Sequence, residues 1–118
     1  MEKQLNVVGG GIENRGLLDL KNVKITNNTA IENGGGIRNA EYLDISNSTV
    51  TGNTAGIDCG GIYNIGDRIT MNNVVINNNK ALRGAGIYSN IAMFIYTSII
   101  KNNTAIEDGG GILNGREI

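Results

Sequence analysis

Residues 27–39 read NNTAIENGGGIRN and residues 102–114 read NNTAIEDGGGILN, so each stretch holds a glycine-rich step followed by an isoleucine. The step recurs throughout the chain, and its isoleucine returns at a constant interval, at Ile12, Ile37, Ile62, Ile87 and Ile112. This period of about 25 residues lies within the range, roughly 20–50 residues, that is typical of solenoids and other repeat architectures. The repeat therefore decides the fold class before any single segment is interpreted.

The glycine-rich step varies little among its copies. They are Gly9-Gly10-Gly11, Gly34-Gly35-Gly36, Cys59-Gly60-Gly61, Gly84-Ala85-Gly86 and Gly109-Gly110-Gly111. Glycine suits a corner whose backbone angles are closed to other residues, and it also suits a close approach of two strands. We expect one of these two roles for the step, although the Cys and Ala copies show that not every position needs glycine.

Apolar residues form columns when the repeats are aligned. The first columns are spaced by two residues, at Leu18/Leu20, Leu43/Ile45, Ile69/Met71 and Met93/Ile95. Another column contains Ile25, Val50, Ile76 and Ile100. A spacing of two predicts β-strands, and stacked columns predict a continuous core.

A polar column accompanies the apolar ones, two residues before an alanine in each repeat. Its members are Asn28, Asn53, Asn79 and Asn103. Side-chain amides that repeat at the spacing of stacked strands can donate to and accept from one another. We predict a structural amide ladder at these positions, and not a binding site.

The third repeat tests whether the coils are stacked. Ile69 and Asn79 each lie one residue later than the period would place them after their counterparts Leu43 and Asn53, whereas Ile87 is back in register. An insertion in one part of the coil is thus cancelled by a deletion in the next. This compensation is expected if the strands are stacked, because it restores the pairing register between successive coils.

The pattern predicts an all-β chain with three short strands per coil and no helix. We interpret it as a right-handed parallel β-helix of about 4.7 coils, in one domain spanning residues 1–118. Complete repeats cover residues 12–36, 37–61, 62–86 and 87–111, with partial coils at 1–11 and 112–118. The right-handedness is expected from the chirality of parallel crossovers.

The phrases at residues 27–39, 47–64 (NSTVTGNTAGIDCGGIYN) and 102–114 also resemble a known family. They are similar to the repeats of secreted bacterial and archaeal β-helix proteins, above all polymorphic outer-membrane proteins and related adhesins. The resemblance covers essentially the whole chain and implies a pectin-lyase-like β-helix in a secreted or cell-surface setting. The chain departs from the family pattern in two respects. Ile or Val stands where a Phe usually opens the Asn-containing motif, and GGG mostly stands where GGA would. No site residues are carried over.

Composition excludes several function classes. Ten basic and eleven acidic residues are scattered singly, so no basic stripe favours nucleic acid. The chain has no histidine and a single cysteine, Cys59, which removes the commonest metal ligand and any internal disulfide. No segment is apolar enough to cross a bilayer, and residues 1–11 do not resemble a secretion signal. We expect no cofactor, no metal and no membrane insertion by this segment.

The sequence gives only weak support for any catalytic, metal-binding, phosphate-binding or ice-binding site. Asp19 and Asp44 share a column, but we expect Arg68 or Ile69 and then Phe94 in the next coils, so the pair does not persist. The glycine steps lack the Lys-Ser/Thr of a phosphate loop and the Asp of calcium-binding coils.

Charged and bulky neighbours interrupt the rows of threonine that an ice-binding surface needs. Sequons begin at Asn27, Asn47 and Asn102, and their glycosylation stays open.

These observations favour a non-catalytic structural role. The leading expectation is an extracellular or cell-surface β-solenoid segment that acts as a stalk or as a contact surface for a glycan or protein of the host or cell surface. One alternative is a subunit that stacks end to end into a fibre, because open solenoid ends expose strand edges. A second alternative is a fragment of a carbohydrate-active β-helix enzyme, although we predict no catalytic residues.

Overall fold

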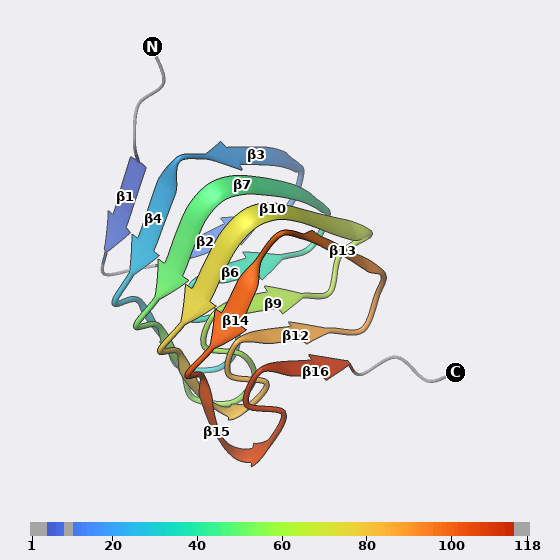
Figure 1. Ribbon diagram of the computed structural model, residues 1–118. Helices are drawn as coiled ribbons and strands as arrows, with labels where there is room; N and C mark the ends of the chain where they lie inside the picture. The colour runs from blue at the N-terminus through green and yellow to red at the C-terminus, as the bar shows by residue number, and fades with distance from the viewer. Residues whose placement is uncertain (1–4, 9–10, 115–118) are drawn as a thin grey trace.

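The computed structural model describes residues 5–8 and 11–114, and these residues form a parallel β-solenoid without helices (Figure 1). Each complete coil passes through three sheets, which we call A, C and B in chain order. All paired strands are parallel. The predicted fold class, an all-β solenoid with three strands in each coil, is confirmed.

The longest sheet, sheet A, contains seven strands. They are β1 (Leu5–Val8), β3 (Leu17–Lys21), β4 (Val23–Thr26), β7 (Tyr42–Thr51), β10 (Arg68–Asn77), β13 (Met93–Tyr96) and β14 (Ile99–Lys101). In the middle coils a single ten-residue strand spans the sheet, whereas the coil before and the coil after divide the same path between two strands.

Two shorter sheets complete the coil. Sheet C contains β5 (Thr29–Ala30), β8 (Thr54–Ala55), β11 (Lys80–Arg83) and β15 (Thr104–Asp108). Sheet B contains β2 (Ile12–Asn14), β6 (Ile37–Asn39), β9 (Ile62–Asn64), β12 (Ile87–Ser89) and β16 (Ile112–Asn114). The isoleucines that revealed the repeat stack directly on one another in sheet B.

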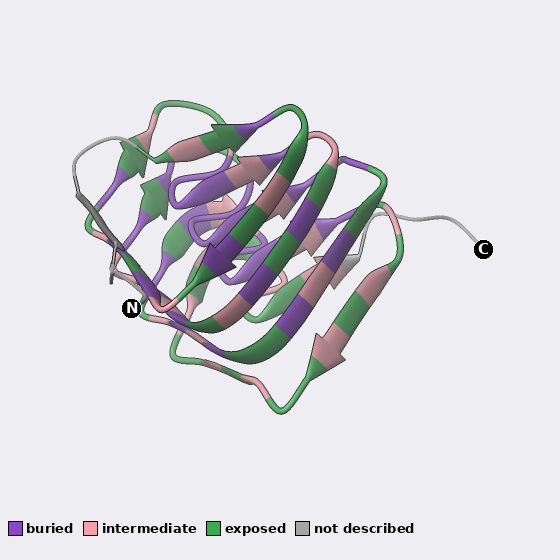
Figure 2. Ribbon diagram, turned by 90° about the horizontal axis from the view of Figure 1, so that it is seen from above, coloured by how far each residue is buried: buried purple, intermediate pink, exposed green. Residues whose placement is uncertain are grey.

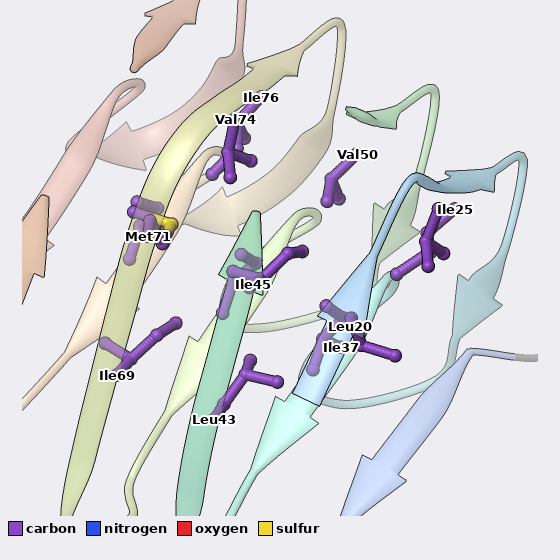
Figure 3. Packing of buried hydrophobic residues seen from close by; sticks show 13 residues of the cluster. Leu20, Ile25, Ile37, Leu43, Ile45, Val50, Ile69, Met71, Val74 and Ile76 are labelled. Atoms are coloured by element: carbon purple, nitrogen blue, oxygen red, sulfur yellow. The ribbon is translucent and has the colours of Figure 1, made fainter. Parts of the chain in front are cut away.

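The core consists of stacked aliphatic columns, as predicted. Buried and exposed positions alternate along the long strands (Figure 2), because successive side chains of a strand point to opposite faces. Figure 3 shows the two predicted core columns, of which Leu20, Ile25, Ile45, Val50, Met71 and Ile76 are buried. Their counterparts in the following coil, Ile95 and Ile100, are half-buried and pack against the same core.

The glycine-rich step performs both of the roles considered from the sequence. Its first position has a positive φ in every described copy: Gly34 (73°), Cys59 (59°), Gly84 (59°) and Gly109 (66°). Its third position lies against the next coil, since a Cβ at Gly36 would stand 2.7 Å from the carbonyl oxygen of Gly61. The second position tolerates Ala85, which is completely buried.

The structure also contains the one-residue shift in the third repeat and its later compensation. Strand β9 pairs with β6 in the regular register, Ile37 opposite Ile62, whereas β10 pairs with β7 one residue later, Leu43 opposite Ile69. The regular register returns where Asp58 bridges Arg83. The insertion thus lies in the corner before β10, and the compensating deletion lies within β11.

Candidate functional site

The predicted column of asparagines forms a chain of side-chain hydrogen bonds inside the solenoid. Asn28 Nδ2 donates to Asn53 Oδ1 (2.9 Å), Asn53 Nδ2 to Asn79 Oδ1 (3.0 Å), and Asn79 Nδ2 to Asn103 Oδ1 (2.9 Å). The first three side chains are completely buried. These amides are therefore occupied in joining one coil to the next.

Each ladder amide also binds the backbone of its neighbours. The Asn53 amide donates a second hydrogen bond to the carbonyl oxygen of Ile25 (3.0 Å), and its Oδ1 accepts from the backbone N–H of Asn28 (2.9 Å). Asn79 repeats both bonds one coil later. Both donor hydrogens of these two amides are thus used, which matters because an unpaired buried polar group is costly.

A residue with left-handed backbone angles precedes every ladder asparagine. These residues are Asn27 (φ 56°), Gly52 (70°), Asn78 (57°) and Asn102 (55°). A second column of residues with positive φ lies at the corner between the two halves of sheet A. Its members are Asn22 (φ 56°), Asn47 (50°), Asn73 (57°) and Thr97 (48°). Asn and Gly enter this region most easily, which accounts for the abundance of asparagine.

A second polar ladder, which we did not predict, runs through sheet B. Asn14 Nδ2 donates to Asn39 Oδ1 (2.9 Å), Asn39 Nδ2 to Asn64 Oδ1 (2.9 Å), and Asn64 Nδ2 to Ser89 Oγ (3.0 Å). Its sequence signal is a polar residue two positions after each repeat isoleucine. In both ladders the hydrogen bond from one side chain to the next is donated towards the C-terminal coil.

The paired aspartates of sheet A lie in one outward column, as the alignment indicated. Asp19 pairs with Asp44, and both are exposed. The next residue in the column is Thr70, so the expectation of Arg68 or Ile69 there was wrong; the extra residue of the third repeat falls before Arg68 and shifts the strand by one place. Phe94 follows, as expected. The described residues hold no group of three or more Cys, Asp or Glu that could bind a metal together.

The outer face of sheet B carries a mixed charged and aromatic column. Arg38 Nη1 lies 2.7 Å from Glu13 Oε1, and the rings of Tyr63 and Tyr88 stack at 5.0 Å. The guanidinium of Arg15, followed by that of Arg38, holds the pKa of the Glu13 carboxyl below its ordinary value. Desolvation, followed by the neighbouring Tyr88, raises the pKa of Tyr63.

The corner between sheets C and B contains the one cysteine. Asp58 forms an ion pair with Arg83, whose Nε lies 2.9 Å from Asp58 Oδ1, and the backbone N–H of Asp58 donates to Asn33 Oδ1. The adjacent Cys59 is completely buried, with its thiol directed at the carbonyl oxygens of Ile62 and Gly86. Burial raises the pKa of this thiol strongly.

The three sequon asparagines are all exposed. Asn27 and Asn102 lie before the ladder, and Asn47 lies at the corner of sheet A, where its Oδ1 accepts from Asn73 Nδ2 (2.8 Å). Their glycosylation stays a prediction.

Comparison of the chain with protein-family models, curated proteins and solved structures finds no match. Within the described residues, no helix is long and apolar enough to span a bilayer.

Proposed function

We propose that this chain is a rigid, non-catalytic β-solenoid segment of a secreted or cell-surface protein, which acts as a stalk or presents a contact surface. One observation carries the proposal: in sheets A and B the inward residue types repeat, whereas the outward residues of the strands change from coil to coil. A repeated interior sets the length and stiffness of a rod, and a varied exterior is free to make specific contacts.

Sheet B shows this contrast within single strands. Its repeat column is isoleucine in every coil, from Ile12 to Ile112. The outward column beside it contains Glu13, Arg38, Tyr63, Tyr88 and Leu113. The resemblance of the repeats to adhesin-type proteins supports an extracellular setting and a glycan or protein as partner.

Surface digestion of intact cells of the source organism tests the proposal. Brief protease treatment should release peptides of this chain into the medium, while a cytoplasmic protein measured in the same sample stays intact. Recovery of the chain only after cell lysis would contradict an extracellular role. Turnover of pectin or a similar polymer by the purified chain would contradict a non-catalytic one and favour the enzyme alternative.

A second candidate function is assembly into a fibre by end-to-end stacking. The observation in its favour is that the first and last strands of sheet C lie in identical hexapeptides, NNTAIE at residues 27–32 and 102–107. Like strands stack on like strands throughout the solenoid. Strands β1 and β2 lie one layer ahead of β5, so two stacked copies would meet first through sheets A and B. Electron microscopy, with sizing at several concentrations, distinguishes fibres from a persistent monomer.

A further inference from the structure

Sheet C carries a hollow of about 340 Å³ with mostly apolar walls. The residues that line it belong to three successive layers, those of β8, β11 and β15. The middle strand, β11, pairs with β8 on one side and with β15 on the other. The hollow is therefore lined entirely by described residues, and it runs across the strands, along the axis of the solenoid.

Two columns of outward positions form the walls of the hollow. Inward and outward positions alternate along a strand, and the alanines between the two walls, Ala55 and Ala81, are buried. One wall contains the first residues of the three strands, Thr54, Lys80 and Thr104. The other wall contains the residues that follow the alanines, Gly56, Leu82 and Ile106. The hollow thus opens on the outer face of sheet C.

A glycine interrupts the aliphatic wall and makes room for a ligand. The residue after the sheet C alanine is aliphatic in three coils, at Ile31, Leu82 and Ile106. In the remaining coil it is Gly56, whose N–H donates to the carbonyl oxygen of Ala30 (3.1 Å). A Cβ at Gly56 would collide with the carbonyl oxygen of Ile31. The strands stay paired at this point, while the space that a side chain fills in the other coils is left open.

Polar recognition in the hollow falls to the side chains of one wall. The N–H groups of Thr54, Lys80 and Thr104 donate to carbonyl oxygens of the preceding coil at 2.8–2.9 Å, so the backbone is committed to strand pairing. Lys80 is the one charged residue that lines the hollow, and it takes part in none of the ion pairs among the described residues. A cation available to a ligand therefore lies opposite an aliphatic wall.

We propose that this hollow binds an unbranched aliphatic carboxylate, a small molecule with one anionic group on an apolar chain. Its volume, its mostly apolar walls and its few polar groups are those of small-molecule sites in general. The ammonium of Lys80 is complementary in charge to the carboxylate, and the hydroxyls of Thr54 and Thr104 can donate to the same group. The apolar chain then lies along Leu82 and Ile106.

The shape of the hollow favours an unbranched chain over a peptide strand. The hollow crosses paired strands, so it offers no row of free backbone groups with which an added strand could pair. A straight apolar chain needs no such groups and gains from the removal of its surface from water. The inference goes beyond the structural role proposed above and does not depend on it.

Calorimetric titration of the intact chain with sodium hexanoate, octanoate and decanoate, each below its critical micelle concentration, tests the proposal. Each added methylene that still lies within the hollow should tighten binding about two- to fourfold, because it removes more apolar surface from water. Octanol is the matched neutral probe and should bind more weakly than octanoate. Added salt should weaken the binding of octanoate, since it screens the charge of Lys80, and should not weaken the binding of octanol.

Three variants locate the site. Lys80→Gln removes the charge and should weaken the binding of octanoate about fivefold, while the binding of octanol stays the same. Ile106→Asn removes part of the apolar wall and should weaken the binding of both ligands. Ile31→Asn is the matched control, because Ile31 holds the same place in an identical hexapeptide, is equally open to solvent and does not line the hollow. This variant should bind both ligands normally.

Amide chemical shifts give a second readout that needs no variant. Octanoate should shift the amide signals of β8 and β11 and leave those of β6 and β9 in sheet B unchanged, so these shifts decide if a variant does not fold. The proposal is overturned by the absence of saturable binding, by equal affinity for octanoate and octanol, or by equal losses in the Ile106 and Ile31 variants. Shifts confined to sheet B would overturn it as well.

Discussion

At the scale of single residues, the chain uses asparagine for two different purposes. Buried asparagines such as Asn53 satisfy one another in the ladders, whereas exposed asparagines such as Asn78 supply left-handed corners. The sequence predicted the first ladder, because its column lies beside an alanine column. It did not separate the corner residue from the ladder residue, since the two are adjacent and often identical in type.

The ladder is tested by Asn53→Asp. A carboxylate cannot donate to Asn79 or to Ile25, and burial of its charge is unfavourable, so we expect a loss of about 1–3 kcal/mol in the free energy of unfolding at neutral pH. The loss should shrink on acidification, because a protonated carboxyl can donate again. Asn78→Asp is the control: it is exposed and should change the stability by no more than about 0.5 kcal/mol. Equal denaturant midpoints for the two variants would argue against the ladder.

The corner columns are tested at Thr97, the one β-branched residue among them. Thr97 has φ 48°, a conformation that is unfavourable for a branched side chain, whereas its counterparts in the three preceding coils are asparagines. Thr97→Asn should raise the free energy of unfolding by about 1 kcal/mol. The same change at Thr70, which lies within β10, should give no gain. Chemical denaturation compares the two, and a loss at Thr97 would show that the corner is not strained.

The Cys59 thiol gives a pH-dependent prediction. Its pKa is raised in the folded protein by burial, so the neutral form is favoured by folding. The resulting stabilisation is complete below the pKa of an unfolded thiol, about 8.5, and is lost as the pH rises above it. Between about pH 8.5 and 9.5 the wild-type chain should lose stability more steeply than Cys59→Ala. Parallel pH profiles of unfolding would contradict this account.

At the scale of elements, the strands and their order could be read from the sequence because each buried column repeats in type. The second ladder was missed although Asn14, Asn39 and Asn64 carry its signal, because a lone polar residue inside a short strand is also compatible with an outward position. The division of the sheet A path into one or two strands could not be predicted. It depends on pairing with the neighbouring layers, which local composition does not encode.

The core columns are tested by Ile45→Ala. Ile45 is 1% exposed in the middle of sheet A, so the truncation should lower the free energy of unfolding by about 2–5 kcal/mol, through lost transfer energy and a cavity. Ile106→Ala is the matched control, because Ile106 is 81% exposed on the outer side of β15 and should cost no more than about 0.5 kcal/mol. A loss below about 1 kcal/mol at Ile45 would be inconsistent with its burial.

At the scale of the whole molecule, the stacked repeats explain how a chain with a modest core holds a defined shape. In the described part of the chain, the complete coils are bonded to one another by backbone pairs in three sheets and by two interior polar ladders. The sequence predicted this stacking but treated residues 1–11 simply as a partial coil. The strand pairing shows in addition that β1 is out of step with the later coils, because Leu5 pairs with Val23.

The most direct test of the account is the in-register stacking of equivalent positions in successive coils. Tyr63 and Tyr88 face each other in adjacent parallel strands, at a spacing of roughly 4.8 Å that a disulfide can bridge, whereas Arg38 lies two layers from Tyr88. The pair Tyr63→Cys and Tyr88→Cys should oxidise readily in the native protein, and the pair Arg38→Cys and Tyr88→Cys should not; the buried Cys59 should take no part. Mass spectrometry after mild oxidation of the native protein distinguishes the outcomes. A disulfide between positions 38 and 88, or none between 63 and 88, would contradict the stacked solenoid.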